Sequence, residues 1–175
     1  MAEPQTALLR IRPAEPADVP LLLQMFRELA DYEHLGDHVQ ATEERLRLAL
    51  FGERPAAEAL IAELGSDVAG YAVFFPTFST FLAIQGIWLE DIFVRPAHRN
   101  AGVGRALLAE VAAALRARGG DRLEWSALTW NELALGFYRG LGAQRMDDWV
   151  THRLVGPDLE SLAAEAVRDP GAARR

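Results

Sequence analysis

The stretch from Trp88 to Arg105, WLEDIFVRPAHRNAGVGR, is the part of the chain that most restricts its fold. It begins as an apolar strand that carries two acids, continues through a turn with proline, and ends in a basic, glycine-containing loop that opens a helix. Such a loop leaves backbone N–H groups at the helix N-terminus unpaired, and small residues let phosphate groups approach them. The stretch therefore predicts a strand, a candidate phosphate-binding loop and a helix in direct succession.

The glycine spacing of this loop is Arg99-x-x-Gly102-x-Gly104. It is neither the dinucleotide-binding fingerprint nor the Walker P-loop, because the third glycine of the first and the Gly-Lys-Ser/Thr of the second are absent. On spacing alone, an ordinary strand-to-helix connection is the more frequent explanation of two such glycines. The surrounding motifs have to decide between the two interpretations.

Length and composition favour one globular domain over residues 1–175. The sequence is 50% hydrophobic, yet it contains no apolar run of the roughly 18 to 20 residues that a membrane span requires. We expect the core at about residues 8–155, with a peripheral helix and a frayed tail, DPGAARR, within 157–175. No signal peptide is evident and no cysteine is present, so a cytoplasmic location is expected.

The formal net charge of -7 argues against a nucleic acid partner, because neutralising phosphates requires clustered basic residues. It favours cationic small molecules, which a negative protein attracts over long distances. Acids that merely keep the surface soluble explain the charge equally well. The four histidines are scattered, so no metal site is expected.

The hydrophobic pattern alternates between strands and helices, which predicts an α/β protein with a mixed central sheet and helices on both faces. We expect strands at residues 8–12, 57–64, 68–78, 84–94, 122–127, 143–146 and 149–154. We expect helices at 18–32, 42–51, 131–141 and 157–167, and one from the glycine loop to about residue 118.

Several motifs together resemble one family. The run LEDIFVRP-x-x-RNAGVGRALL is similar to the pyrophosphate-binding motif of the GCN5-related N-acetyltransferases, the GNAT superfamily. The segments YEHL, GYAVFFPTFSTF and WSALTWNELALGFYRGLGA resemble its spermidine/spermine (diamine) and thialysine N-acetyltransferase branch, over about residues 11–154. The resemblance implies the GNAT fold, acetyl-CoA as cosubstrate, a small primary amine as acceptor, and a homodimer with Trp149 and DDWVTHRL as interface candidates.

The resemblance also assigns cofactor contacts. The backbone at Ile92 and Val94 would pair with the pantetheine arm between two splayed central strands, and the loop at 100–105 would hold the pyrophosphate. Arg99 would order the loop, and Asn131 could contact the arm and cap a helix at once. The full implied set is Ile92, Phe93, Val94, Arg99, Asn100, Ala101, Gly102, Val103, Gly104, Arg105, Asn131, Ala134 and Tyr138.

Transfer to an amine requires a proton acceptor, since presenting an aliphatic amine as the neutral base at pH 7 costs about 4 kcal/mol. Glu90 and Asp91 are adjacent in a predicted strand, so we expect their side chains on opposite faces, with at least one directed toward covered space. Burial would raise the pKa of that acid and improve it as a base. The resemblance points to Glu90 as the base and Asp91 in the amine channel; a hydrogen-bonded structural acid is the alternative.

The departing thiolate requires a proton donor, and a tyrosine with a pKa near 10 suits a thiol with a pKa near 8.5. The resemblance places Tyr138, within FYRGLG, at the position of this general acid; a core aromatic residue is the alternative. Because the chain has no cysteine for an acyl-enzyme, we expect direct transfer.

The resemblance places further acceptor contacts along a groove of acids, which would suit a diamine or polyamine. The implied substrate-binding set is Tyr32, Glu33, Ser79, Glu90, Asp91 and Asp148, with Asp147 as the alternative to Asp148. Ser79 stands where polyamine enzymes carry an acid, which weakens the case for long polyamines and leaves thialysine-like amino acids open. Alternatives are an acetyltransferase for a protein amine or an aminoglycoside, and a non-catalytic acetyl-CoA-binding regulatory module.

Overall fold

A computed structural model describes residues 8–166 of the chain. Its centre is a five-stranded sheet with neighbouring strands in the order β1-β2-β3-β4-β5. The strands are β1 (Leu9–Pro13), β2 (Glu58–Leu64), β3 (Asp67–Ser79), β4 (Ile84–Val94) and β5 (Arg122–Trp125). All neighbours are antiparallel except β4 and β5, which are parallel, so the prediction of a mixed sheet is confirmed.

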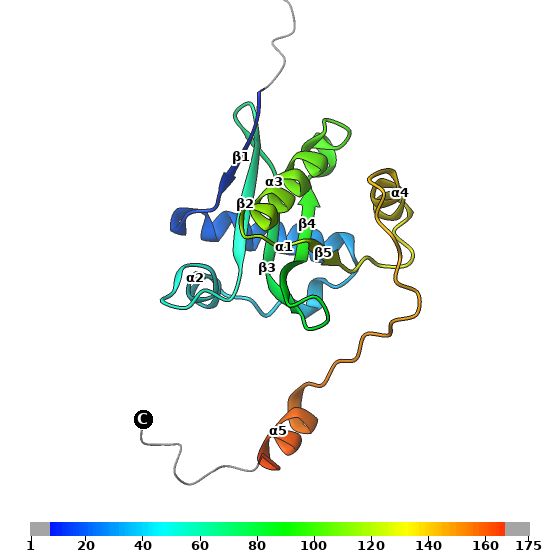
Figure 1. The fold of residues 1–175 in the computed structure, drawn as a ribbon. Coiled ribbons are helices and arrows are strands. Elements are labelled where there is room, and N and C mark those ends of the chain that lie inside the picture. Colours follow the sequence, from blue (N-terminus) through cyan, green and yellow to red (C-terminus); the bar gives the residue numbers. More distant parts are fainter. Residues whose placement is uncertain (1–7, 167–175) are drawn as a thin grey trace, which may run out of the picture. The chain divides into compact units, whose positions relative to one another are not determined.

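The helices are α1 (Val19–Tyr32), α2 (Glu43–Phe51), α3 (Val103–Ala117), α4 (Glu132–Gly140) and α5 (Gly156–Ala164), with short turns η1 (Pro16–Asp18), η2 (Gly36–His38) and η3 (Pro96–His98). The start of α2 follows a capping signal in the sequence: the Thr42 hydroxyl accepts a hydrogen bond from the Arg45 N–H at 3.2 Å and so caps this helix. Figure 1 shows α1 and α3 on opposite faces of the sheet. None of the helices within residues 8–166 has the length and apolar content that a membrane crossing requires.

The chain divides into two compact units, one ending at Ser126 and one beginning at Ala127. The first contains the sheet with α1, α2 and α3, and the second contains α4 and α5. A single domain over residues 1–175 stays a prediction. The frayed tail expected at DPGAARR lies outside the described residues.

The main core of the first unit lies on the α1 face of the sheet. Here α1 and α2 pack against β2, β3 and β4 through Val19, Leu22, Leu23, Met25, Leu46, Leu50, Ala59, Ile61, Tyr71, Val73 and Phe93, all of them buried. Burial of this apolar surface is the principal force that holds the two helices on the sheet. Tyr71 is the residue of this set that carries a polar atom into the core.

The ladder between β3 and β4 contains a β-bulge at Glu90. Val73 pairs with Asp91 and Phe74 pairs with Leu89, so Glu90 has no partner on β3. An extra residue of this kind interrupts the alternation of side chains and increases the local twist. The bulge therefore changes the expected directions of the two adjacent acids.

The strands predicted at 143–146 and 149–154 are wrong, because these segments form turns and irregular chain between α4 and α5. Trp149, for example, donates its N–H to the Met146 carbonyl at 3.2 Å in a turn. A β-strand requires a neighbour for its ladder, and no described strand pairs with residues 143–155. The apolar side chains that suggested strands, Met146, Trp149, Val150 and Leu154, are instead exposed.

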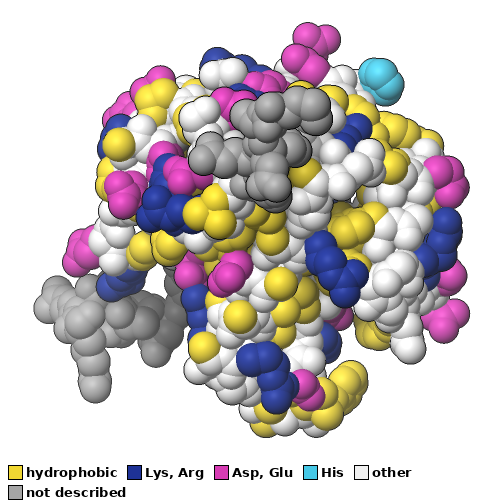
Figure 2. Space-filling view, turned by 90° about the horizontal axis from the view of Figure 1, so that it is seen from above, with side chains coloured by type: hydrophobic (Ala, Val, Ile, Leu, Met, Phe, Trp, Pro, Cys, Tyr) yellow, Lys and Arg dark blue, Asp and Glu magenta, His cyan; other side chains and the backbone are white. Residues whose placement is uncertain are grey.

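All 18 basic residues other than histidine are arginines, and many of them pair with acids. Arg12 contacts Asp18 and Glu63 at 2.6 and 2.7 Å, and Arg118 contacts Glu58 at 2.6 Å. Acidic and basic side chains are interspersed on the face seen in Figure 2. Partly exposed pairs of this kind contribute only about 1 kcal/mol or less each to stability.

Candidate active site

The loop between β4 and α3 has the backbone shape of an anion-binding loop. It contains η3 and then two residues in the left-handed region, Asn100 with φ 63° and Gly102 with φ 79°. Gly102 is the N-cap of α3 and has no side chain with which to cap the first N–H groups of this 15-residue helix. The positive end of the helix dipole lies at the same place.

The space beside Gly102, at the start of this helix, is open. A Cβ atom built on Gly102 would meet nothing within 4 Å, so the side on which a side chain would stand is open. Open space, free helix N–H groups and a favourable dipole are the features that bind diphosphates elsewhere. The residues between Asn100 and Arg105 therefore suit the ligand that the sequence predicts for them.

Arg99 fixes this loop to two other elements. Its Nε donates a hydrogen bond to the Val94 carbonyl at 3.2 Å, and its guanidinium lies 4.7 Å from the centre of the Tyr32 ring. The first contact holds the end of β4, and the second is a cation–π contact with the end of α1. Arg99 thus acts on the shape of the loop through protein contacts.

The edge of β4 that faces β5 is only partly paired. Gly86 to Leu89 pair with Arg122 to Trp125, and the pairing ends there. Ile92, Phe93 and Val94 lie beyond the last pair. Among the described strands, none covers this part of the edge, so its backbone groups are placed to pair with an extended ligand.

Glu90 and Asp91 lie on the same side of the sheet, which corrects the expectation of opposite faces. Asp91 pairs with Val73, and Trp88 pairs with Phe75, so Asp91 and Trp88 share the α1 face. Trp88 Nε1 donates a hydrogen bond of 2.9 Å to the Glu90 carboxylate, which brings Glu90 to that face as well. The bulge is the physical reason, because it adds one residue between positions that would otherwise alternate.

The two acids differ in burial. Glu90 is exposed, whereas Asp91 is half-buried. Burial, followed by the charges of Glu90 and Glu33, raises the pKa of Asp91 from 3.8 to about 6. The covered acid that the sequence predicted in this pair is therefore Asp91 rather than Glu90.

The end of α1 contributes further groups to the same face. Glu33 follows the last residue of α1, and burial raises the pKa of its carboxyl. The charge of Glu33 acts on Asp91, so the two carboxyls belong to one cluster. We call Glu33, Glu90 and Asp91 the acid cluster; Tyr32 precedes Glu33 and holds Arg99.

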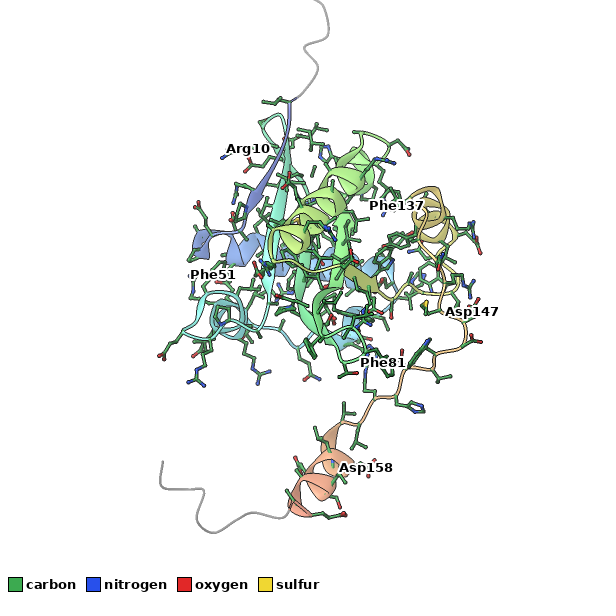
Figure 3. All side chains as sticks on the ribbon, viewed as in Figure 1. Arg10, Phe51, Phe81, Phe137, Asp147 and Asp158 are labelled. Carbon is green, nitrogen blue, oxygen red and sulfur yellow. The ribbon has the colours of Figure 1, made fainter. Side chains whose placement is uncertain are left out.

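Ser79 is not brought to the acid cluster. It lies at the far end of β3, about 20 Å along the strand from Val73, the partner of Asp91. Ser79 is 4% exposed, and its hydroxyl accepts a hydrogen bond from the Leu82 N–H at 3.4 Å. It therefore supports the turn to β4, whose tip carries the exposed Phe81 (Figure 3).

The second unit holds the remaining predicted residues. Asn131 caps α4, since its side-chain oxygen accepts a hydrogen bond from the Ala134 N–H at 3.2 Å. Tyr138 lies in the last turn of α4, with its ring centre 5.4 Å from that of Phe137. Asp148 follows Asp147, which pairs with Arg145 at 2.8 Å in the segment after α4 (Figure 3).

Tyr71 is the residue of this region that sequence reasoning missed. The phenol lies inside the core cluster, and its hydroxyl interacts with Asp91. In the sequence it is one aromatic residue in the apolar run GYAVFF, which fits a buried strand completely. The signal that could have revealed it was its hydroxyl, because a buried tyrosine usually directs that group at a polar partner.

Comparisons with known proteins show the family to which the chain belongs. Residues 22–143 match the Acetyltransferase (GNAT) family, whose members use acetyl-CoA as cosubstrate. The chain is 35% identical to the thialysine N-epsilon-acetyltransferase of Bos taurus, over 91% of this chain and 99% of that protein. It is 31% identical to the L-ornithine N5-acetyltransferase of Arabidopsis thaliana, over 87% of each.

A solved structure has the same fold. An integron cassette protein from V. cholerae superposes with a TM-score of 0.74 at 26% identity, over 89% of this chain and 97% of that chain. The family match covers both the loop before α3 and the acid cluster. This chain therefore belongs to the acetyltransferase (GNAT) family and is an acyltransferase.

Proposed function

We propose that the protein transfers the acetyl group of acetyl-CoA directly to a primary amine of a small cationic amino acid or diamine. The observation that carries the proposal is the arrangement of β4, which holds two carboxylates on one face and is followed by a loop that leads into the N-terminus of α3 without a side-chain cap. The loop suits a diphosphate, and the carboxylates suit an ammonium group. The groups that would bind the cosubstrate and the amine thus lie on one strand and on the loop that follows it.

Each group has a distinct role in this proposal. The backbone from Ile92 to Val94 and the loop at 100–105 bind and orient the cosubstrate, with Asn131 and Ala134 as further contacts. Asp91 and Glu33 hold the acceptor ammonium, Glu90 takes its proton through water, and Tyr138 protonates the departing thiolate. The roles of Glu90 and Tyr138 rest on the resemblance of their motifs.

The expected size of the acceptor depends on how far the carboxylates extend along the sheet. The carboxylates gather near Asp91, and Ser79 supplies no negative charge farther along β3. A short acceptor with one or two amines matches such a site better than a long polyamine. Relatives named for thialysine and L-ornithine support this preference. A cytoplasmic location stays a prediction.

A thiol-release screen tests the proposed function. Thialysine, ornithine, lysine, putrescine, spermidine, spermine and a few peptides are each supplied with acetyl-CoA, and released CoA is measured with a thiol reagent. This chain has no cysteine to react with the reagent and no lysine to accept the acetyl group, so the background is low. We expect turnover with the short amino-acid amines; acetyl-CoA binding without release for any amine would indicate a regulatory module.

Replacing Gly102 with alanine should weaken acetyl-CoA binding at least about tenfold. The new methyl group would enter the open space before α3, and the left-handed backbone would cost roughly 1 kcal/mol of stability. Gly119→Ala is the matched control, because Gly119 also has a positive φ of 73° with open space around it but lies at the other end of α3. Calorimetry should find a similar loss of stability in both variants and weaker binding in Gly102→Ala alone; equal affinities would contradict the role of the loop.

We further propose a homodimer formed through the segment around Trp149. Trp149, Val150 and Val155 are 73%, 76% and 63% exposed, and large exposed apolar groups close together usually mark a contact surface. Trp149→Asp should therefore convert a dimer into a monomer in light-scattering measurements, whereas Leu48→Ser, at an exposed apolar position on α2, should not. A monomeric unmodified protein would contradict the proposal.

A further inference from the structure

Tyr71 is held rigidly in the core of the first unit. It is 0% exposed, and its ring lies 5.0 Å from the Phe26 ring and 6.1 Å from the Phe93 ring, measured between centres. Packing on both sides fixes the direction of the phenol. The position of its hydroxyl is therefore set by the fold.

The hydroxyl is directed at Asp91. Tyr71 pairs with Phe93 and Val73 pairs with Asp91, so Tyr71 and Asp91 are diagonal neighbours on the same face of β3 and β4. Diagonal neighbours are within reach of each other when one is aromatic. Among residues 8–166, no group meets the buried hydroxyl within ordinary hydrogen-bond geometry, although its interaction with Asp91 lowers the pKa of that acid.

The charged groups around this hydroxyl are acids. Besides Asp91 from β4, the carboxylates of Glu33 and Glu28 act on Tyr71 from the end of α1, and Glu90 acts on Asp91. Glu28 is neutralised by Arg95 through two hydrogen bonds of 2.7 and 2.8 Å. Among the described residues, no arginine acts on the pKa of Asp91, so this acid has no counter-ion in that part of the chain.

We propose that Tyr71 is a positioning residue for the acceptor, whose hydroxyl donates a hydrogen bond to the Asp91 carboxylate and orients it toward the bound ammonium group. The inference rests on the proposed function and extends it to a residue outside the motifs. The ammonium group of the acceptor would supply a positive charge beside Asp91. A hydrogen-bond donor would then keep the Asp91 carboxylate ionised and oriented toward that group. A buried hydroxyl with no other partner can supply that hydrogen bond.

Tyr71→Phe tests this role, because it removes the hydroxyl and keeps the ring. Without the hydroxyl the pKa of Asp91 should rise further above about 6, so a smaller fraction of Asp91 is ionised near neutral pH. We expect KM for the amine to rise about threefold to tenfold at pH 6.5, the difference to narrow above pH 8, and the affinity for acetyl-CoA to stay within twofold. A role in packing alone would not produce this pH dependence.

Phe26→Leu is the control for packing, because it removes the ring beside Tyr71 and leaves the hydroxyl in place. It should lower the melting temperature without moving the acid limb of the pH profile. If the unmodified protein turns over amines and Tyr71→Phe has the same acid limb and the same KM, the inference is wrong. If the unmodified protein acetylates no amine, the proposed function fails, and carbon-13 NMR titration of the Asp91 carboxyl still decides whether Tyr71 lowers its pKa.

Discussion

Tyr138→Phe should lower kcat at least about a hundredfold while acetyl-CoA still binds with an affinity within about threefold of the unmodified protein. The substitution removes only the hydroxyl that would protonate the departing thiolate, and general acids commonly contribute a factor of 10² to 10⁴. The ring remains to pack beside Phe137, 5.4 Å away between centres, so α4 should keep its structure.

Steady-state thiol release and calorimetry together check this expectation. Loss of the general acid should flatten the alkaline limb of the pH–rate profile, since the phenol no longer titrates there. A decrease of less than about threefold in kcat would show that Tyr138 is a packing residue of α4. Equal losses of kcat and acetyl-CoA affinity would point to a binding role instead.

Asp91→Asn should reduce kcat/KM for the amine at least about thirtyfold and, at pH 7.5, make the protein more stable. The loss of activity follows because the amide cannot neutralise the acceptor ammonium group, and removing one partner of a buried charged pair costs 2 kcal/mol or more. The gain in stability follows because the folded protein raises the pKa of Asp91 from 3.8 to about 6. Folding therefore works against ionisation of this residue.

The sign and the pH window follow from proton linkage. Well below pH 3.8 Asp91 is protonated in both the folded and the unfolded chain, so the substitution should make little difference there. As the pH rises to about 6, only the unfolded chain releases the proton freely, and the free energy of unfolding falls by up to about 3 kcal/mol. Above that pH the full penalty is present, and the asparagine variant avoids it.

Chemical denaturation at pH 4 and pH 7.5 checks the prediction. Glu90→Gln is the matched comparison on the same strand. Activity should fall by roughly 10², because the proposed base is lost. Stability should not rise, because the Glu90 side chain is exposed. An asparagine variant that is less stable than the unmodified protein at pH 7.5 would show that Asp91 is a hydrogen-bonded structural acid.

The sequence predicted those parts of the fold that depend on local signals. A signal of only a few residues predicts each of three features: the Thr42 cap, the hairpin around Gly65 and the loop before Val103. All three form where expected. The mixed sheet and its two covered faces followed from the alternation of strands and helices.

Features that depend on pairing between distant segments were not predictable in the same way. The bulge at Glu90 exists only relative to β3, so the alternation rule gave the wrong directions for Glu90 and Asp91. The apolar residues around Trp149 have strand character, but none of the described strands pairs with them. Tyr71 was overlooked because its importance lies in what its hydroxyl faces across the sheet.

Because Glu90 has no partner on β3, the proposed chemistry depends on the number of residues in β4 as well as on their identity. A homologue that lost one residue there could keep every acid of the motif and still present its carboxylates to opposite sides of the sheet. Conserved residue identities in this strand would then not show that the homologue is inactive. To predict whether a homologue is active, the length of its β4 strand should be compared first, and the identities of its residues second.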